Sequence, residues 1–377
     1  MNDSLAGITV VAVEQAVAAP YASSRLADAG ARVIKIERRE GDFARDYDRM
    51  VRGQSAYFVW LNRGKESVCL DIKSPDDRLL LEHMIAEADV FIQNLKPGSL
   101  QQLGLGHASL SALHPRLITC DITGFGSSGP RSHLKAYDLI VQAEAGLCSI
   151  TGNSVGPARV GVSVCDIAAG MTAHSAILQA LFARERTGRG SNIQISLFDA
   201  VADWMNVPFL QHVYARHETV RAGVSHPSLA PYGAFRCNDG HDVIFSVQND
   251  REWLNFCTLF LSRPDLVRHQ QFADNSARIA NRAALELIIG KRFTKLNSIE
   301  AMSALEAAGL AYGELNDIGK LTEHPHLRTI EVETPNGLID IIAPPAVVDG
   351  QVLSLRPVSA LGQHTDAIKF EFLQRRA

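Results

Sequence analysis

The stretch that decides the fold is residues 8–37, ITVVAVEQAVAAPYASSRLADAGARVIKIE. Residues 8–13 are rich in β-branched side chains, residues 20–29 suit a helix that ends at Gly30, and residues 32–37 are a second β-branched run. Two strand-like runs joined by a helix are typical of a β-α-β unit, whose strands lie parallel in one sheet. The chain therefore begins with a predicted parallel α/β fold.

The same alternation continues beyond this unit. Strands are predicted at 67–71, 90–93 and 117–122, with a helix over 75–88 between the first two, and this order favours a mostly parallel sheet. The later predicted elements are a helix over 166–186, a strand over 192–196 and a helix over 197–204.

Turn-rich sequence after Arg221 marks a second, smaller module. It contains HPSLAPYGAF, residues 226–235, followed by a predicted strand over 242–248. Strands predicted at 329–333 and 337–342 return the chain to the first module. We therefore predict the N-terminal part of a large domain over residues 1–220, a small domain over 221–322 and a C-terminal return to the large domain over 323–377.

Composition limits the classes of function. The chain has 377 residues, 46% hydrophobic and 21% charged, which is ordinary for a folded protein of more than one domain. A formal net charge of -4 without a long basic run argues against nucleic acid as a partner. The six cysteines form no CxxC pair, so reduced thiols are expected. The N-terminus lacks a signal-peptide pattern and no window approaches the roughly 18 apolar residues of a membrane span, so we predict a cytoplasmic protein without membrane contact.

One acidic residue in apolar company is especially informative. Asp166 lies between Val164 and Ile167 at the start of the long predicted helix. An ionised carboxylate taken out of water is costly unless it is paired or hydrogen-bonded. Two interpretations stay open from the residues alone: Asp166 caps the helix by accepting backbone N–H bonds, or it acts as a nucleophile or base.

Polar residues near the predicted strand ends suggest a ligand site, because ligands of open α/β sheets bind beyond the carboxyl ends of the strands. A nicotinamide dehydrogenase is disfavoured, since residues 14–20, EQAVAAP, lack the glycines of a dinucleotide turn. The histidines of HPH, 324–326, match no metal-ligand spacing, so no metal site is predicted. Five residues either converge on one anionic ligand or are scattered surface groups: Gln15, Arg38, Asn62, Lys65 and Asn94.

Several sequence blocks together resemble the family III CoA-transferases, which include carnitine and formyl-CoA transferases and the α-methylacyl-CoA racemases. The blocks are VEQAVAAPYASSRLADAGARVIKIER, LNRGKESVCLDIK, DVFIQNLKPGSLQQLGL, ITGFGSSGP, YDLIVQAEAGL and LGQHT. They span nearly the whole chain, and within the family the chain most resembles the itaconate and mesaconyl-CoA branch of dicarboxylate CoA-transferases.

The resemblance implies a fold, a ligand and an assembly. The fold would be a Rossmann-like large domain with a smaller α/β domain, in two subunits threaded through one another as an interlocked homodimer. The ligand would be a coenzyme A thioester used as substrate, with no permanently bound cofactor. Gln102 and Thr123 stand where formyl-CoA transferase has basic residues, so their contacts with coenzyme A stay open. Residues implied along the coenzyme A site are Gln15, Arg38, Asn62, Lys65, Asn94 and Tyr137, with Lys65 or Arg38 near the phosphates.

The resemblance also implies a role for Asp166. The family nucleophile is an aspartate that attacks the donor thioester, gives a mixed anhydride and is then converted to an aspartyl thioester. In the dicarboxylate branch this aspartate begins a DI-x-x-G block, and Asp166 in DIAAG matches it, which favours a nucleophile over a helix cap. Racemases of the family have a His-Asp pair where this chain has Tyr137 and Asp138. A neutral tyrosine is a poor base near pH 7, which disfavours a racemase that uses two bases. Racemisation is therefore kept as the alternative function.

The substrate prediction comes from two further blocks. Residues 223–235, GVSHPSLAPYGAF, and 245–253, FSVQNDREW, resemble the branch that acts on C4 to C5 dicarboxylates such as itaconate, mesaconate, citramalate or malate. We therefore predict transfer of coenzyme A from succinyl-CoA, or a similar acyl-CoA, to such an acid. The distal carboxylate needs a cation or N–H donors, for which His226, Tyr232 and Arg251 are candidates, although Arg251 is equally well explained as a solvated surface charge. A coenzyme A-binding dimer without turnover is a further alternative.

Overall fold

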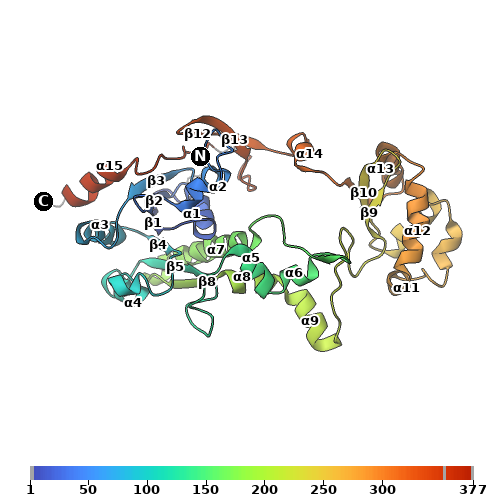
Figure 1. The fold of residues 1–377 in the computed structure, drawn as a ribbon, viewed down its shortest axis with the longest axis horizontal. Coiled ribbons are helices and arrows are strands. Elements are labelled where there is room, and N and C mark those ends of the chain that lie inside the picture. Colours follow the sequence, from blue (N-terminus) through green and yellow to red (C-terminus); the bar gives the residue numbers. More distant parts are fainter. Residues whose placement is uncertain (1–3, 351–353, 375–377) are drawn as a thin grey trace. The chain divides into compact units, whose positions relative to one another are not determined.

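A computed structural model describes residues 4–350 and 354–374 of the chain (Figure 1). These residues form two compact units. The first unit contains the described residues up to Cys148, Arg159–Leu210 and those from Arg328 onward, and the second contains Ser149–Ala158 and Gln211–Leu327. Residues 149–158, 211–220 and 323–327 belong to the second unit, whereas the sequence pattern assigned them to the large domain.

The first unit is built on a six-stranded parallel sheet with strand order β3-β2-β1-β4-β5-β8. The chain forms β2 and β3 on one side of β1 and then continues with β4 on the other side, so the strand order reverses between β1 and β4. This arrangement confirms the predicted α/β class with a parallel sheet. The strands are β1 (Thr9–Val13), β2 (Arg32–Glu37), β3 (Lys65–Cys69), β4 (Val90–Gln93), β5 (Ile118–Thr123) and β8 (Asn192–Ser196).

The central strands β1 and β4 are buried on both faces, which explains their apolar runs TVVAV and VFIQ. In β1, Val10 and Ala12 contribute to one hydrophobic core, whereas Val11 and Val13 contribute to the other. Figure 1 shows the covering helices beside the sheet. The first core includes residues of α1 (Ala18–Asp28), α7 (Val164–Thr187) and α8 (Leu197–Trp204), and the second includes residues of α3 (Pro75–Ala86) and α4 (His107–Leu113).

Helix α7 crosses α1 closely and belongs to the first core. At Gly170 an added Cβ would lie 2.6 Å from the carbonyl oxygen of Ala18, so this approach requires glycine. By length and composition α7 could cross a membrane, with a mean hydropathy of 1.2, contrary to the expectation that no window would approach this limit. Its burial in the first core explains the apolar sequence, because core helices pass the same test.

The second unit has its own antiparallel sheet and an aromatic core. The strand order is β11-β10-β9, with β9 (Tyr232–Arg236), β10 (Asp242–Ser246) and β11 (Ala311–Glu314). Phe245 stacks on Phe256 with 4.9 Å between ring centroids. Other elements of this unit are the pair β6 (Gly152–Asn153) and β7 (Gly156–Pro157), helices α10 (Asp250–Asn255), α11 (Asn275–Ala280), α12 (Arg282–Phe293), α13 (Ser298–Ala307) and α14 (Ile318–Thr322), the π-helical turn η3 (Phe256–Phe260) and the 3₁₀ helix η4 (Pro264–Arg268).

The C-terminal hairpin of the first unit, β12 (Thr329–Thr334) and β13 (Gly337–Ile342), matches the two predicted strands. The remaining elements of the first unit are 3₁₀ helices η1 (Phe43–Asp46) and η2 (Gln101–Leu103), helices α2 (Ala56–Leu61), α5 (Asp138–Glu144) and α15 (Thr365–Lys369), and the π-helical turn η5 (Phe370–Gln374). Helices α6 (Leu147–Ile150) and α9 (Asn206–Ala215) lie where the chain passes from one unit to the other.

Candidate active site

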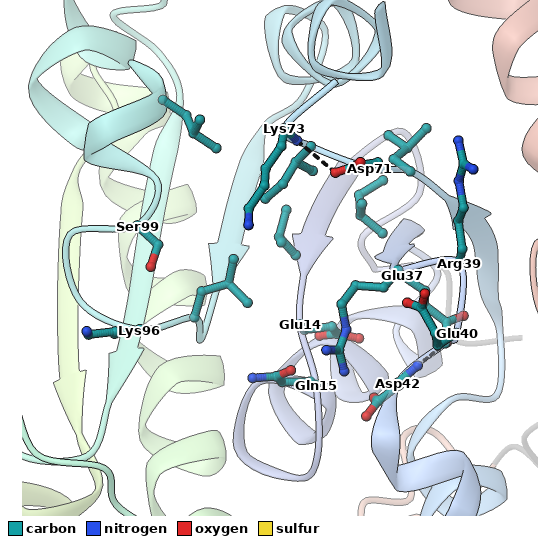
Figure 2. A pocket seen from close by; sticks show the side chains of 18 of the residues that line it. Glu14, Gln15, Glu37, Arg39, Glu40, Asp42, Asp71, Lys73, Lys96 and Ser99 are labelled. Carbon is teal, nitrogen blue, oxygen red and sulfur yellow. Dashed lines mark hydrogen bonds between the residues drawn. The ribbon is translucent and has the colours of Figure 1, made fainter. Parts of the chain in front are cut away.

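A cavity of about 750 Å³ lies at the carboxyl ends of β1 to β4 in the first unit (Figure 2). Residues that closely follow these strands line it, among them Gln15 after β1, Arg38 after β2, Asp71 after β3 and Lys96 after β4. Ligands of open α/β sheets bind in the crevice where the strand order reverses, which here is between β1 and β4. The cavity therefore lies where the sheet topology favours a ligand.

The turn after β1 contributes Gln15 to the cavity, and side chains from two other segments hold the backbone of this turn. Asn94 accepts a hydrogen bond from the Gln15 N–H at 2.9 Å and donates one to the Gln15 carbonyl oxygen at 2.8 Å. The next residue, Ala16, has a φ of 63°, in the left-handed region that a residue with a Cβ enters at a cost. Asp42 accepts a hydrogen bond from the Ala16 N–H at 3.0 Å. Asn94 and Asp42 together fix this turn.

The cavity borders a buried network of charged side chains. Lys35 donates a hydrogen bond to Asp42 at 2.8 Å, and its ammonium nitrogen lies 3.6 Å from a carboxylate oxygen of Glu14. Lys65 donates to the same Glu14 oxygen at 2.7 Å. These four side chains are at most 1% exposed. Each buried charge therefore has a partner of opposite sign, the arrangement that limits the cost of burial.

Glu37 extends the network towards the surface. It accepts two hydrogen bonds from Arg45, each of 2.8 Å, and one from Ser67 at 2.6 Å. Burial alone would raise the pKa of Glu37, but the Arg45 hydrogen bonds and the Lys35 charge lower this pKa to about 2. For Lys35, burial opposes the charged form, yet the surrounding carboxylates keep its pKa above the ordinary value. For Lys65 burial prevails and lowers the pKa to about 8.

The predicted coenzyme A residues occupy different places around the cavity. Gln15, Arg38 and Gln102 line it. Lys65 and Asn62 are buried instead, with the Lys65 ammonium donating to the Asn62 side-chain oxygen at 3.3 Å, and neither is among the lining residues. The position of Lys65 is therefore that of an internal counter-ion for Glu14.

Two other positions from the coenzyme A prediction have internal partners. Asn94 is hydrogen-bonded to the backbone of Gln15, so its effect on the cavity is through the turn after β1. The Thr123 hydroxyl donates to the carbonyl oxygen of Ile195 at 3.3 Å and accepts from the Gly126 N–H at 3.0 Å. Thr123 therefore joins the ends of β5 and β8.

Asp166 lies in the first turn of α7, but Ser163 is the N-cap residue of that helix. The helix-cap interpretation of Asp166 is therefore wrong, because the helix begins at Val164, before the aspartate. Burial first, and then the charge of Asp138, raise the pKa of Asp166 to about 7. Within residues 4–350 and 354–374, no hydrogen bond or opposite charge offsets these two effects. Asp166 is thus a carboxylate whose charged form the protein disfavours.

Asp138 has the partners that Asp166 lacks. It is the first residue of α5 and accepts hydrogen bonds from the Gln142 side chain at 2.6 Å and from the Cys165 N–H at 2.7 Å. Because Cys165 lies in the first turn of α7, this bond satisfies one of the N–H groups that the start of a helix leaves free. Asp138 therefore joins α5 to the start of α7. The neighbouring Tyr137, the N-cap residue of α5, is exposed.

Two tyrosines that the sequence patterns did not single out lie near Asp166. The Tyr47 and Tyr57 rings contact edge to face with 5.5 Å between centroids, and the Tyr57 hydroxyl lies 3.5 Å from the Ser163 hydroxyl. Burial first, and then the charges of Asp42 and Asp166, raise the pKa of Tyr47 to about 12. Tyr47 therefore lies within electrostatic reach of both the cavity wall and Asp166.

The three predicted residues for a distal carboxylate belong to the second unit. The His226 and Tyr232 rings stack with 5.3 Å between centroids, and the His226 N–H donates to the Tyr232 carbonyl oxygen at 2.9 Å. Arg251 is exposed on α10. The structure thus brings His226 and Tyr232 together. In the described part of the chain, no group of three or more His, Cys, Asp or Glu side chains is placed to hold a metal ion.

Comparison with known proteins assigns the family. The family model for CoA-transferase family III matches residues 5–365. This chain belongs to CoA-transferase family III. It is 33% identical to succinyl-CoA:glutarate CoA-transferase of Mus musculus, over 98% of this chain and 86% of the relative. It is 34% identical to acetyl-CoA:oxalate CoA-transferase of Acetobacter aceti (91% and 89%) and 32% identical to succinyl-CoA:mesaconate CoA-transferase of Haloarcula marismortui (87% and 84%).

A solved structure supports the same family. The crystal structure of a CaiB/BaiF family protein from Brucella suis matches with a TM-score of 0.85 and 32% identity, over 99% of this chain and 100% of the other. The protein is therefore an enzyme that uses coenzyme A thioesters as substrates. For a family III CoA-transferase, a carboxylate with a pKa near 7 is chemically apt, because it ionises near neutral pH and can then act as a nucleophile.

Proposed function

We propose that this enzyme transfers coenzyme A from succinyl-CoA, or a similar acyl-CoA, to a C4–C5 dicarboxylate such as itaconate, mesaconate, citramalate or malate. The observation that carries the proposal is the surroundings of the Asp166 carboxylate, which disfavour its charged form. This half-buried carboxylate lies close to the charge of Asp138, lacks a compensating hydrogen bond among the described residues, and has its pKa raised to about 7. Because no donor in the described part of the chain occupies the lone pairs of its ionised form, we infer that Asp166 is the nucleophile.

The reaction proceeds by four exchanges at carbonyl carbon. The Asp166 carboxylate attacks the donor thioester, and the C–S bond breaks to give a mixed anhydride and the coenzyme A thiolate. The thiolate attacks the Asp166 carbonyl carbon, which releases the donor acid and leaves an aspartyl-CoA thioester. The acceptor carboxylate attacks this thioester to give a second mixed anhydride and the thiolate. The thiolate then attacks the acceptor carbonyl of that anhydride, which forms the new acyl-CoA and regenerates Asp166.

We infer that coenzyme A occupies the cavity at the carboxyl ends of β1 to β4. Gln15 and Arg38 line this cavity and provide an amide and a guanidinium for hydrogen bonding. The lining carboxylates of the buried network are matched by Lys35, Lys65 and Arg45, which limits their repulsion of the ligand's phosphates. Further cations of the lining suited to phosphates are Arg39, Lys73 and Lys96, labelled in Figure 2.

The remaining predicted coenzyme A residues act less directly in this proposal. Lys65 and Asn62 support the cavity from within, and Asn94 holds the Gln15 backbone. The exposed Tyr137 is assigned to the acyl end of the ligand, because it directly precedes Asp138, whose charge acts on Asp166.

The acceptor class follows from the relatives and from the second unit. Glutarate, mesaconate and oxalate, named for three relatives, are all dicarboxylates, and the first two have five carbons. His226, Tyr232 and Arg251 are proposed to recognise the distal carboxylate, since a buried carboxylate needs a cation or several N–H donors. Replacing each by alanine should raise the KM for the dicarboxylate more than the KM for the acyl-CoA.

We further propose that the enzyme works in the cytoplasm as an interlocked homodimer. Large apolar side chains on two helices of the chain are exposed, which suits burial against a second copy. They include Phe182 on α7, 69% exposed, and Phe209 on α9, 60% exposed. Light scattering coupled to gel filtration should give twice the mass of the 41.0 kDa chain.

An exchange assay tests the proposed function. The purified enzyme is incubated with succinyl-CoA and each candidate acid, with formate and carnitine as controls, and the new acyl-CoA is followed by liquid chromatography. Transfer to a C4–C5 dicarboxylate and not to the controls supports the proposal. Transfer to formate or carnitine alone would overturn it.

The raised pKa of Asp166 also suits a general base, which keeps racemisation as the second candidate. A racemase would exchange the hydrogen next to the thioester carbonyl with solvent. We expect no deuterium uptake into a 2-methylacyl-CoA in D₂O, because Tyr137 stands where the partner base would be. Uptake that depends on Asp166 would support the racemase instead.

A further inference from the structure

The turn after β1 is held in a conformation that its own residues do not favour. Ala16 has a φ of 63°, where a residue with a Cβ is rarely found outside special sites. It directly follows Gln15, which lines the cavity. Among the residues that the structure describes, two side chains hydrogen-bond this backbone: Asn94 at Gln15 and Asp42 at Ala16. The conformation of the turn therefore depends on groups outside it.

The Asp42 carboxylate joins this turn to a second segment. The oxygen that accepts from the Ala16 N–H at 3.0 Å also accepts from the Ala44 N–H at 2.9 Å, at the start of η1. Helix η1 ends at Asp46 and is followed at once by Tyr47, the residue within electrostatic reach of Asp166. One carboxylate oxygen thus connects the cavity turn with the segment that leads to Tyr47.

Asp42 is itself held by hydrogen bonds with Lys35 and Glu37. Its second oxygen accepts from Lys35 at 2.8 Å, and its own N–H donates to Glu37 at 3.1 Å. Glu37 is fixed in turn by Arg45 and Ser67. Asp42 is 3% exposed, and Figure 2 shows it beside Glu37 at the edge of the cavity. The buried network is therefore arranged to fix this carboxylate in position.

We propose that Asp42 is a positioning residue for coenzyme A: it holds Ala16 in the left-handed conformation and so keeps Gln15 directed into the cavity. This inference rests on the proposed place of coenzyme A in that cavity. Asp42 itself takes no part in the chemical step.

A four-protein cycle tests the proposal by the Kd for free coenzyme A, measured by titration calorimetry. The proteins are the wild type, Asp42→Ala, Ala16→Gly and the double variant. Asp42→Ala should raise the Kd at least tenfold, because the turn relaxes to a negative φ. Ala16→Gly should have a smaller effect, because glycine adopts a positive φ freely. In the glycine background the loss caused by Asp42→Ala should be at least threefold smaller than in the wild type.

A second readout separates positioning from folding stability. The double variant should recover coenzyme A affinity relative to Asp42→Ala without recovering the midpoint of thermal unfolding, since glycine adds freedom to the unfolded chain and Lys35 still lacks its partner. Equal losses of affinity in the alanine and glycine backgrounds would overturn the proposal. A wild type that binds no coenzyme A would overturn it as well.

A charge control keeps the test decisive if Asp42→Ala does not fold. Asp42→Asn retains the oxygen that accepts from Ala16 and Ala44 but weakens the ion pair with Lys35. We expect a Kd within threefold of the wild type together with a lower unfolding midpoint. A tenfold or larger rise in Kd for Asp42→Asn would show that the charge, and not the hydrogen bond to the turn, matters. The Kd measurement does not depend on turnover. A wild type that binds coenzyme A but transfers it to no acid in the exchange assay would therefore refute the proposed function alone.

Discussion

The carboxylates beside the cavity and the carboxylate of Asp166 are buried in different ways. Glu14 and Asp42 are each 3% exposed, and each accepts a hydrogen bond from a lysine ammonium. Asp166 is less deeply buried, yet no donor or cation stabilises its charge within the described residues. Its pKa rises to about 7, whereas that of the well-partnered Glu37 falls to about 2. The contrast teaches that the partners of a carboxylate, more than the depth of its burial, separate a structural acid from a reactive one.

The largest effect is expected when the reactive carboxylate, that of Asp166, is removed. Asp166→Asn should lower the rate of coenzyme A transfer by on the order of 10³-fold or more, because the amide cannot form the mixed anhydride. Steady-state exchange between succinyl-CoA and an accepted dicarboxylate measures the effect. The matched control is Asp138→Asn, which keeps an oxygen for the Cys165 N–H and should lose less than about tenfold. A transfer rate in Asp166→Asn above a tenth of the wild-type rate would contradict this assignment.

Removing a cation from the buried network should lower the free energy of unfolding. Lys65→Ala leaves Glu14 without its closest cation, and we expect the free energy of unfolding to fall by about 3–5 kcal/mol. Urea unfolding followed by circular dichroism measures this change. The control is Arg49→Ala, which breaks an exposed pair with Asp46 whose side chains are 72% and 64% exposed, and should cost less than about 1 kcal/mol. Equal losses in the two variants would mean that the buried network is not structural.

Burying the ionised Asp166 carboxylate destabilises the folded protein, so removing its charge should raise the free energy of unfolding. The folded-state pKa is raised, so the native protein binds the extra proton more tightly than the unfolded chain does, and this stabilisation is lost as the pH rises through about 7. Asp166→Asn should therefore raise the free energy of unfolding by about 4 kcal/mol at pH 8 and change it little at pH 4. Urea unfolding at both pH values measures the difference. A variant less stable than the wild type at pH 8 would contradict the raised pKa.

The smallest expected effect is a shift in the pH profile. Because the charge of Asp138 raises the pKa of Asp166, Asp138→Asn should move the acid limb of kcat/KM from about pH 7 to lower pH, by about one unit. Glu144→Gln is the matched control on the same helix, since Glu144 is an exposed carboxylate paired with Arg131. Profiles that coincide for the wild type and Asp138→Asn would remove Asp138 from this account.

Much of the sheet could be predicted from sequence because its strands are buried on both faces. Residues 8–13 are a continuous apolar or β-branched run and residues 32–37 are rich in β-branched side chains, and the structure has strands at Thr9–Val13 and Arg32–Glu37. Helix α5, Asp138–Glu144, was not predicted, because its seven residues are too few to show the period of a helix.

The buried network could not be predicted in the same way. The family resemblance implied that Lys65 or Arg38 lies near the phosphates, but Lys65 is the buried counter-ion of Glu14. Its partner Glu14 is 51 residues away in sequence, and only the parallel pairing of the sheet brings the two together. The role of Tyr47 was missed for a similar reason, since the only signal is a concentration of aromatic side chains within residues 43–60.

Asp166 was the easiest site residue to find, because a carboxylate among Val164, Ile167 and Ala168 stands out in the sequence. Sequence alone could not separate nucleophile from helix cap, since the two interpretations differ by where the helix begins. The structure starts α7 at Val164 with Ser163 as the N-cap, which removes the cap interpretation.

The most direct test of the central claim is mass spectrometry of peptides after incubation with succinyl-CoA and trapping with hydroxylamine or borohydride, for the wild type and Asp166→Ala. We predict a modification confined to the wild-type peptide that contains Asp166 and absent from the variant. A modification on another residue, or the same modification in Asp166→Ala, would contradict the assignment of Asp166 as the nucleophile.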